Sequence, residues 1–155
     1  MDATAAIGLS KGGVFELLPV LFSAVCLPSP VRSEVVGRGL AGEAEVLAAL
    51  GDWLWEATPG AASLQPFAAL ASPADRAVLA LAQERGLNYI LTDDRKLQSA
   101  AERAGLSWLS TPDVVLALKR IGAVPAVKAV LDRMIANGFG IDAADYAAAL
   151  AAAGE

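Results

Sequence analysis

The chain contains no histidine and only one cysteine among its 155 residues. The absence of histidine excludes imidazole-based triads, imidazole acid–base pairs and every zinc site with imidazole ligands. The lone Cys26 cannot form a disulfide within the chain, and its apolar neighbours Val25 and Leu27 favour a role in packing. Any metal must therefore be bound through oxygen, and oxygen ligands favour magnesium or manganese.

The sequence also lacks long hydrophobic runs and an excess of positive charge. No apolar stretch approaches the roughly 20 residues that cross a bilayer, so we expect a cytoplasmic protein without a membrane span. The formal net charge is -5, and a nucleic-acid partner would therefore need a local basic rim. Hydrophobic residues nevertheless make up 55% of the chain, with a mean hydropathy of +0.50. This surplus predicts a homodimer.

Strand and helix patterns alternate along the chain. Its length fits one domain, residues 1–155. Strands are predicted at residues 23–27, 52–58, 88–92 and 108–109, and a loop is predicted at 60–72. Helices are predicted at 14–18, 30–38, 42–50, 72–86, 95–103, 111–120, 127–135 and 142–150. This alternation predicts an α/β fold whose mostly parallel sheet is covered on both faces.

Acidic residues follow one of the predicted strands directly. Asp93 and Asp94 come after the apolar run Tyr89, Ile90, Leu91, at the strand end where parallel α/β sheets bind ligands. Two adjacent like charges are unfavourable without a cation or a basic partner, so a metal would stabilise the pair. The simpler alternative is that one of them only caps the following helix.

Three further carboxylates belong to the same pattern: Asp2, Glu34 and Asp75. Each has a simple structural alternative. Asp2 would be a frayed terminal charge, Glu34 a residue on a solvated helix face, and Asp75 a residue that complements a helix dipole. Their order along the chain is more informative than any one of them.

That order resembles the PIN-domain family. The resemblance rests on Asp2-Ala3-Thr4, on Pro28 with residues 31–35, on residues 75–82 and on residues 91–95. Residues 117–122, 137–139 and 153–155 are similar to one bacterial and archaeal branch of that family. The resemblance covers nearly the whole chain, and its specificity comes from the order and spacing of short motifs.

The resemblance implies a three-layer α/β/α sandwich and a nuclease that hydrolyses phosphodiester bonds of single-stranded RNA. Its acidic pocket would bind Mg²⁺ or Mn²⁺, which activates water and offsets charge on the scissile phosphate. The implied catalytic residues are Asp2, Glu34, Asp75 and Asp94. The implied metal ligands are Asp2, Asp75, Asp93 and Asp94, and the accessory hydroxyls are those of Thr4 and Thr92.

The resemblance also bears on partners. Many PIN proteins are toxins of toxin–antitoxin pairs, which implies a possible cognate antitoxin. Around the acidic centre, a basic rim for RNA is available in Lys11, Arg32, Arg95, Lys96 and Arg103, although any one of them can equally be an ordinary solvated residue. The three tryptophans, Trp53, Trp55 and Trp108, lie in apolar runs typical of core or dimer contacts rather than of base stacking.

The sequence departs from the family pattern at two places. Only Met1 precedes Asp2, where the family has a hydrophobic strand, so we expect Asp2 to lie on a mobile terminus that holds a metal poorly. Residues 57–72 lack the branch's glycine–glutamate motif, and Asp75 must replace it. These departures keep open a second hypothesis, a catalytically impaired PIN-like module that binds RNA or protein without cleavage. A receiver-like phosphotransfer domain fits least, because no phospho-accepting aspartate with a distal lysine is evident.

Overall fold

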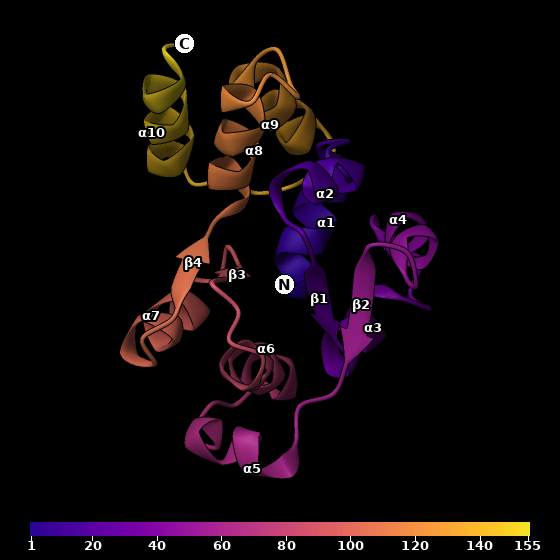
Figure 1. The fold of residues 1–155 in the computed structure, drawn as a ribbon. Coiled ribbons are helices and arrows are strands. Elements are labelled where there is room, and N and C mark those ends of the chain that lie inside the picture. Colours follow the sequence, from indigo (N-terminus) through magenta and orange to yellow (C-terminus); the bar gives the residue numbers. More distant parts are fainter.

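The computed structural model describes all residues from Met1 to Glu155 as an assembly of helices around short parallel strands (Figure 1). The strands are β1 (Val25–Pro28), β2 (Leu54–Ala57), β3 (Tyr89–Leu91) and β4 (Ser107–Leu109). The α-helices are α1 (Ala3–Lys11), α2 (Leu18–Leu21), α3 (Ser29–Val35), α4 (Glu43–Ala49), α5 (Ala61–Leu64), α6 (Pro73–Glu84), α7 (Arg95–Arg103), α8 (Thr111–Arg120), α9 (Val127–Ala136) and α10 (Ala143–Ala153). Two 3₁₀ turns, η1 (Phe15–Leu17) and η2 (Gln65–Phe67), complete the set.

The strands form two small parallel pairs. β1 pairs with β2 so that Cys26 lies opposite Trp55, and β3 pairs with β4 so that Ile90 lies opposite Trp108. The predicted α/β class and parallel strand direction are confirmed. The single central sheet that the sequence predicted is divided into two halves, because no complete strand pairs with β1 on one side and β3 on the other.

The first two residues lie between these halves. The Met1 ammonium donates a hydrogen bond to the Cys26 carbonyl at 3.0 Å, and the Asp2 N–H donates to the Leu91 carbonyl at 3.0 Å. Met1 is 7% and Asp2 6% exposed. The expectation of a mobile terminus is therefore wrong, because hydrogen bonds to both sheet halves fix these residues.

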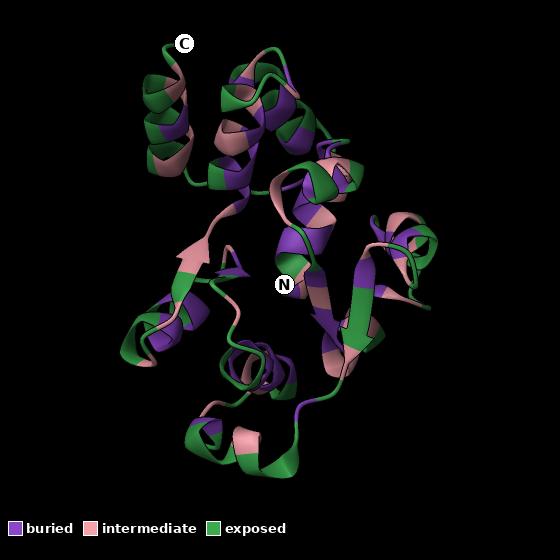
Figure 2. Ribbon diagram, in the orientation of Figure 1, coloured by how far each residue is buried: buried purple, intermediate pink, exposed green.

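One continuous hydrophobic core of 35 buried residues runs through the molecule (Figure 2). Helix α6 lies near its centre, and every residue from Ala77 to Ala82 is buried. This helix contacts α3, β1 and β3, so apolar residues cover its whole circumference over that stretch. The segment of α6 that carries Asp75 is therefore held rigidly against both sheet halves.

The predicted loop at residues 60–72 is wrong, because the segment contains α5 and η2. Pro59 and Gly60 are typical loop residues, but a distant carboxylate organises this segment. Glu84 at the end of α6 accepts hydrogen bonds from the Gly60 N–H and the Ser63 hydroxyl, both at 2.8 Å. Such long-range contacts are not visible in local sequence patterns.

Other predicted boundaries shift for local reasons. The helix predicted at residues 14–18 is the 3₁₀ turn η1 followed by α2, and the helix predicted at 30–38 ends at Val35, after which Val36 is extended. Trp53 lies with its ring centroid 5.3 Å from that of Phe15, as expected for a core residue. Trp55 is 62% exposed on β2, which excludes the core alternative and leaves the predicted dimer contact untested.

No single helix is long and apolar enough to cross a membrane. Helix α1 and the segment Phe15–Leu21 meet the length and composition criteria only as a pair, and this pair bends by 105°.

Candidate functional site

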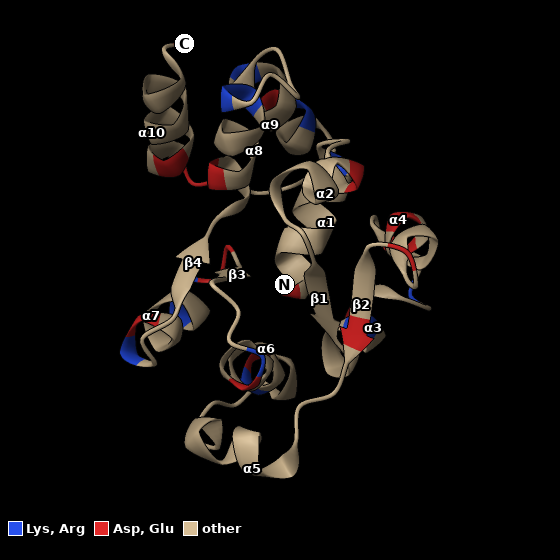
Figure 3. Cartoon of the chain, viewed as in Figure 1, with Lys and Arg blue, Asp and Glu red and all other residues tan.

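Three helices begin with carboxylates near the end of β3. Asp2 is the N-cap of α1, Asp94 is the N-cap of α7, and Asp75 lies in the first turn of α6. Figure 3 shows acidic residues at the amino terminus, on the turn after β3 and on α6. A carboxylate at a helix start is favoured by the unpaired N–H groups and the positive end of the helix dipole. The same local rules therefore place all three residues.

Asp2 is the most deeply buried of these carboxylates. One of its oxygens accepts the Ala5 N–H at 2.7 Å, and the other accepts the hydroxyl of Thr92. Burial raises the pKa of Asp2 from 3.8 to about 6, while these hydrogen bonds and the nearby Met1 ammonium oppose the shift. Asp93 contributes a smaller repulsion that raises the pKa further. Burial also lowers the pKa of the Met1 amino group.

Thr92 joins two of the helix starts. Its fully buried hydroxyl donates to Asp2 and accepts the N–H of Asp94 at 3.1 Å. Its carbonyl accepts a hydrogen bond from the side-chain amide of Gln98 at 3.0 Å, and Gln98 is itself buried. The accessory role predicted for Thr92 thus corresponds to a direct contact, whereas the sequence gave no reason to single out Gln98.

Asp75 and Asp94 form an electrostatic pair. Partial burial raises the pKa of Asp75, and the neighbouring charge of Asp94 raises it further. One Asp94 oxygen accepts the N–H groups of Lys96 at 2.7 Å and Leu97 at 3.4 Å, so the capping interpretation of this residue is correct. The other Asp94 oxygen forms no hydrogen bond within the chain, and the Ser72 hydroxyl is the one side chain that lowers the pKa of Asp75. The free Asp94 oxygen is available to an external ligand.

Asp93 faces a different neighbour. Both of its oxygens are hydrogen-bonded by Thr111 at the start of α8, one by the N–H at 2.8 Å and one by the hydroxyl. Burial raises the pKa of Asp93, the Thr111 hydrogen bonds lower it, and Asp113 and Asp145 raise it. Sequence reasoning interpreted Thr111 only as a helix start. The sequence feature that could have indicated this contact is the pair of hydroxyl residues, Ser110 and Thr111, directly after a predicted strand.

Glu34 and Thr4 have no such partners. Glu34 is half-buried on α3 and forms no hydrogen bond or salt bridge, and Thr4 is exposed in the first turn of α1. No hydrogen bond or salt bridge joins either side chain to Asp2, Asp75 or Asp94. The structure therefore links four of the predicted site residues in two couples, because the charge of Asp93 raises the pKa of Asp2 and the charge of Asp94 raises the pKa of Asp75.

The acidic residues near β3 provide the oxygen ligands that a divalent cation prefers, but few of them lie close together. No group of three or more His, Cys, Asp or Glu side chains lies close enough together to hold a metal ion. Mg²⁺, however, is commonly bound through one or two carboxylates, with water and substrate phosphate oxygens as its remaining ligands. The Asp75–Asp94 couple would supply two such carboxylates.

Most of the predicted RNA-binding cations are engaged within the protein. Lys11 donates to the Gly138 carbonyl at 3.0 Å, Arg32 pairs with Glu56 at 3.4 Å, and Arg95 contacts both oxygens of Asp145 at 2.9 and 2.7 Å. Lys96 and Arg103 are exposed and form no salt bridge. These two residues of α7 are the predicted RNA-binding cations that an anionic ligand would meet without breaking an internal salt bridge.

Comparison with known proteins gives one match. A family model of the PIN domain matches residues 1–155. No curated protein and no solved structure gives a significant match.

Proposed function

From one premise, that the chain belongs to the PIN-domain family, we propose that it is a metal-dependent endoribonuclease acting on single-stranded RNA. The observation that carries the proposal is the Asp75–Asp94 couple. Asp75 and Asp94 start different helices near the end of β3, the charge of Asp94 raises the pKa of Asp75, and one Asp94 oxygen has no hydrogen-bond partner in the protein. Like charges held together in this way favour a bound cation.

The remaining site residues fall into supporting roles. Asp2 and Thr92 fix the start of α1 against the turn that carries Asp94, because the Thr92 hydroxyl contacts both aspartates. We propose Asp2 as a further ligand in its deprotonated form and Glu34 as a catalytic carboxylate that approaches when substrate binds. Asp93, held by Thr111, and Thr4 complete the proposed set.

A bound Mg²⁺ or Mn²⁺ would activate water and neutralise charge on the phosphate. The protein supplies the orientation, since Asp75 lies in a helix that packs against both sheet halves and Asp94 caps a helix that packs against β4. Lys96 and Arg103 are the proposed contacts to the RNA backbone, and Lys11, Arg32 and Arg95 would take part only after giving up their internal partners. With a net charge of -5, such contacts must be local.

The experiment is cleavage of a mixed single-stranded RNA pool by the purified chain with manganese and with EDTA. Asp94→Asn is the decisive variant, because asparagine caps a helix as well as aspartate does and so preserves the start of α7 while removing the charge. We expect manganese-dependent cleavage that drops at least about 100-fold in this variant, as removal of a transition-state interaction predicts.

The matched control is Asp52→Asn, because Asp52 is exposed and its side chain forms no hydrogen bond. It must cleave RNA at the parent rate. Equal cleavage by the Asp94→Asn variant and its parent would overturn the assignment of the site, and so would full activity in EDTA.

A second function is favoured by one specific observation, the absence of any three-carboxylate group. We propose as the alternative a PIN-like module that binds RNA or protein without cleavage. A folded chain that retains labelled RNA on a filter but yields no product with manganese would select this alternative.

We also propose that the chain is the toxin of a toxin–antitoxin pair. A toxin role would require a cognate antitoxin that covers the acidic edge, and co-expression with its genomic neighbour tests this directly.

We also propose a cytoplasmic homodimer. Seven large hydrophobic side chains are exposed, including Trp55 and Tyr89, and light scattering would determine the oligomeric state.

A further inference from the structure

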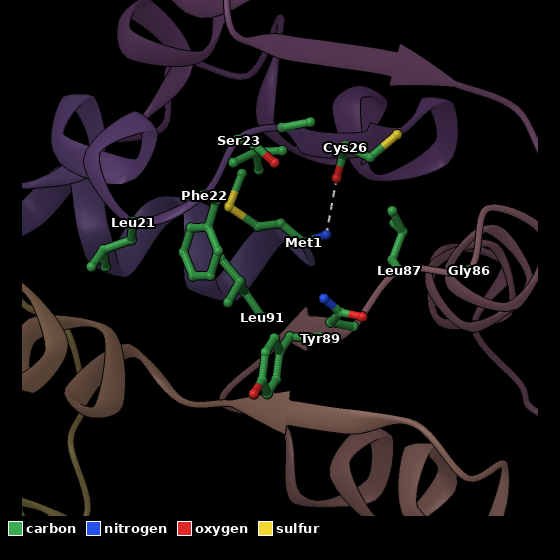
Figure 4. Close-up of a pocket in the computed structure, with 12 residues that line it drawn as sticks. Met1, Leu21, Phe22, Ser23, Cys26, Gly86, Leu87, Tyr89 and Leu91 are labelled. Carbon is green, nitrogen blue, oxygen red and sulfur yellow. Dashed lines mark hydrogen bonds between the residues drawn. The ribbon is translucent and has the colours of Figure 1, made fainter.

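A cavity of about 280 Å³ lies between α7 and β4 on one side and α8 and α10 on the other, and the proposed catalytic carboxylates do not line it. We call it the α10 cavity. A larger cavity of about 370 Å³ is lined by Met1 (Figure 4), at the place where the family pattern has a hydrophobic strand, and it indicates no separate site. The α10 cavity differs from it because polar side chains from three elements line it together with a tryptophan.

The apolar lining of the α10 cavity suits a flat ring. Trp108 of β4 is half-buried there, and the Glu102 carboxylate holds the indole in place by accepting its N–H at 3.0 Å. Helix α10 contributes Ala148, Ala149 and Ala152, whose small side chains leave room. Pockets for drug-sized ligands have volumes of roughly 300–1,000 Å³, so this slightly smaller space suits a single base. Unpaired bases stack on aromatic side chains of this kind.

Gln98 provides a buried acceptor at the cavity. This residue is 5% exposed, and its amide nitrogen donates to the Thr92 carbonyl at 3.0 Å. That hydrogen bond fixes the orientation of the amide, and the remaining atom, Oε1, forms none. It is not sealed from solvent, because the fully buried side-chain atoms without a partner are Ser10 Oγ and Arg32 Nε. Since Gln98 lines the cavity, a ligand there would supply the missing donor.

Asp113 provides a second acceptor. One of its oxygens accepts the N–H of Ser110 at 2.9 Å and the Ser110 hydroxyl at 2.6 Å, and the other oxygen forms no hydrogen bond. The second carboxylate that lines the cavity, Asp145, has both oxygens occupied by Arg95. The cavity therefore presents two free acceptors, one from an amide and one from a carboxylate.

We propose that the α10 cavity binds a guanine base. The Watson–Crick edge of guanine carries two adjacent donors, N1–H and the 2-amino group, which match Gln98 Oε1 and the free Asp113 oxygen. Adenine and cytosine carry one amino group beside an acceptor, and uracil carries one N–H between two carbonyls. Each of these bases would place an acceptor against one of the two oxygens, which is unfavourable in a partly desolvated site.

The cavity is connected to the acidic edge through Gln98. Its amide holds the Thr92 carbonyl, and the Thr92 hydroxyl contacts the Asp2 carboxylate and the backbone N–H of Asp94. A guanosine of single-stranded RNA in the cavity would therefore direct cleavage to a neighbouring phosphate. This link to cleavage rests on the proposed function, whereas binding of the base does not.

The experiment measures nucleotide binding by isothermal titration calorimetry in EDTA. Guanosine monophosphate should bind at least about tenfold more tightly than the adenosine, cytidine and uridine monophosphates. Inosine monophosphate lacks only the 2-amino group and should also bind at least about tenfold more weakly. An adenosine octamer with one central guanosine identifies the source: tighter binding than the plain octamer assigns the base to RNA, and selectivity confined to the mononucleotide assigns it to a free nucleotide.

Two variants on adjacent residues of α10 test the location. Ala152 is exposed and lines the cavity, so Ala152→Leu should fill the space and abolish binding of guanosine monophosphate without lowering the Tm. Ala151→Leu is the matched control, since Ala151 is also exposed but does not line the cavity, and it should bind as the parent does.

A third variant tests the chemistry of recognition. Asp113→Asn keeps one oxygen for Ser110 and replaces the free oxygen with an amide that donates, so the preference for guanosine over inosine monophosphate should disappear.

Equal affinity for all the mononucleotides would overturn the proposal, as would guanosine monophosphate binding that survives Ala152→Leu. Absence of nucleotide binding by the folded chain would also overturn it. Because binding is measured without manganese, a chain that binds the guanine nucleotide but never cleaves RNA contradicts the proposed function alone. A chain that cleaves RNA without binding the nucleotide contradicts this inference alone.

Discussion

At the scale of single residues, the hydroxyl of Thr92 is the contact that holds the acidic edge together. It donates to the Asp2 carboxylate and accepts from the backbone N–H of Asp94. Asp2 and Asp94 are far apart in the sequence and cap different helices, α1 and α7. Both groups are buried or half-buried, so a lost hydrogen bond would leave a polar atom without a partner. Such an atom is costly, which makes Thr92 a sensitive point for stability as well as for the site.

Replacing Thr92 with valine keeps the shape and removes the hydroxyl. The variant should lose about 1–3 kcal/mol of unfolding free energy, because the Asp2 carboxylate remains buried without its donor. Urea unfolding monitored by circular dichroism measures this loss. Thr4→Val is the matched control, since Thr4 is exposed and has no hydrogen-bond partner; a loss of similar size there would contradict the role given to Thr92.

The raised pKa of Asp2 predicts how stability depends on pH. Its pKa is 3.8 in the unfolded chain and about 6 in the folded chain, so the folded state holds the proton more tightly. This group therefore stabilises the fold below about pH 4, and the contribution, about 3 kcal/mol, is lost as pH rises through about 6.

Asp2→Asn removes that titration. In EDTA, the variant should be more stable than the parent at pH 7, by about 1–3 kcal/mol, and its stability should vary less between pH 4 and 7. Urea unfolding at several pH values measures both effects, and Asp52→Asn should leave the parent profile unchanged. A parent chain that gains stability steadily from pH 4 to 7 would refute this account of Asp2.

At the scale of elements, the last residue of the chain joins three helices. The side chain of Glu155, which follows α10, accepts the N–H groups of Val127 at 2.9 Å and Lys128 at 2.8 Å at the start of α9, and it pairs with Lys119 of α8 at 2.5 Å. These hydrogen bonds lower the pKa of Glu155 to about 2. The carboxylate provides the N-terminal cap that α9 lacks in its own sequence, because Ala126 has no capping side chain.

Glu155→Gln should therefore loosen α9 and α10 together. The charge-assisted contacts become neutral, so amide hydrogen exchange should accelerate at the first turn of α9 and the Tm should fall. The stabilisation by Glu155 is present above about pH 4.5 and is lost as pH falls towards about 2, so parent and variant should converge in acid. Glu16→Gln, at an exposed residue without partners, is the control; unchanged exchange in the Glu155 variant would rule out the cap.

At the scale of the whole molecule, the first helix is packed against the segment after α9. The glycine at position 8 of α1 allows the ring of Phe139 to approach so closely that an added Cβ would lie 2.6 Å from Cζ. Asn137 also donates to the Lys11 carbonyl at 2.8 Å. The beginning and the end of the chain thus stabilise each other across the core.

Gly8→Ala tests this contact against helix propensity. In an open helix the change would stabilise by about 1 kcal/mol, whereas here the collision with Phe139 should give a net loss of about 1–3 kcal/mol. Unfolding of the single variants and of the double variant with Phe139→Leu measures the coupling. The smaller side chain should recover part of the loss, and simple additivity of the two changes would show that the ring does not oppose the new methyl.

The sequence by itself determined the local features of this protein. Asp94 caps a helix, as the capping alternative predicted, and the apolar runs before Asp93 and around Leu27 form buried strands. It also determined the α/β class, because strand and helix periodicities alternate, and it limited any metal ligands to oxygen through the absence of histidine. These properties depend on neighbours within a few residues.

Only the tertiary structure decided which acidic residues meet. The burial of Asp2 depends on the Cys26 and Leu91 carbonyls, and the direction of Asp93 depends on Thr111, 18 residues away. The sequence could not indicate that the charge of Asp94 raises the pKa of Asp75, nor that Glu84 orders the segment predicted as a loop. Each of these outcomes rests on hydrogen bonds or burial between distant segments, which no local pattern encodes.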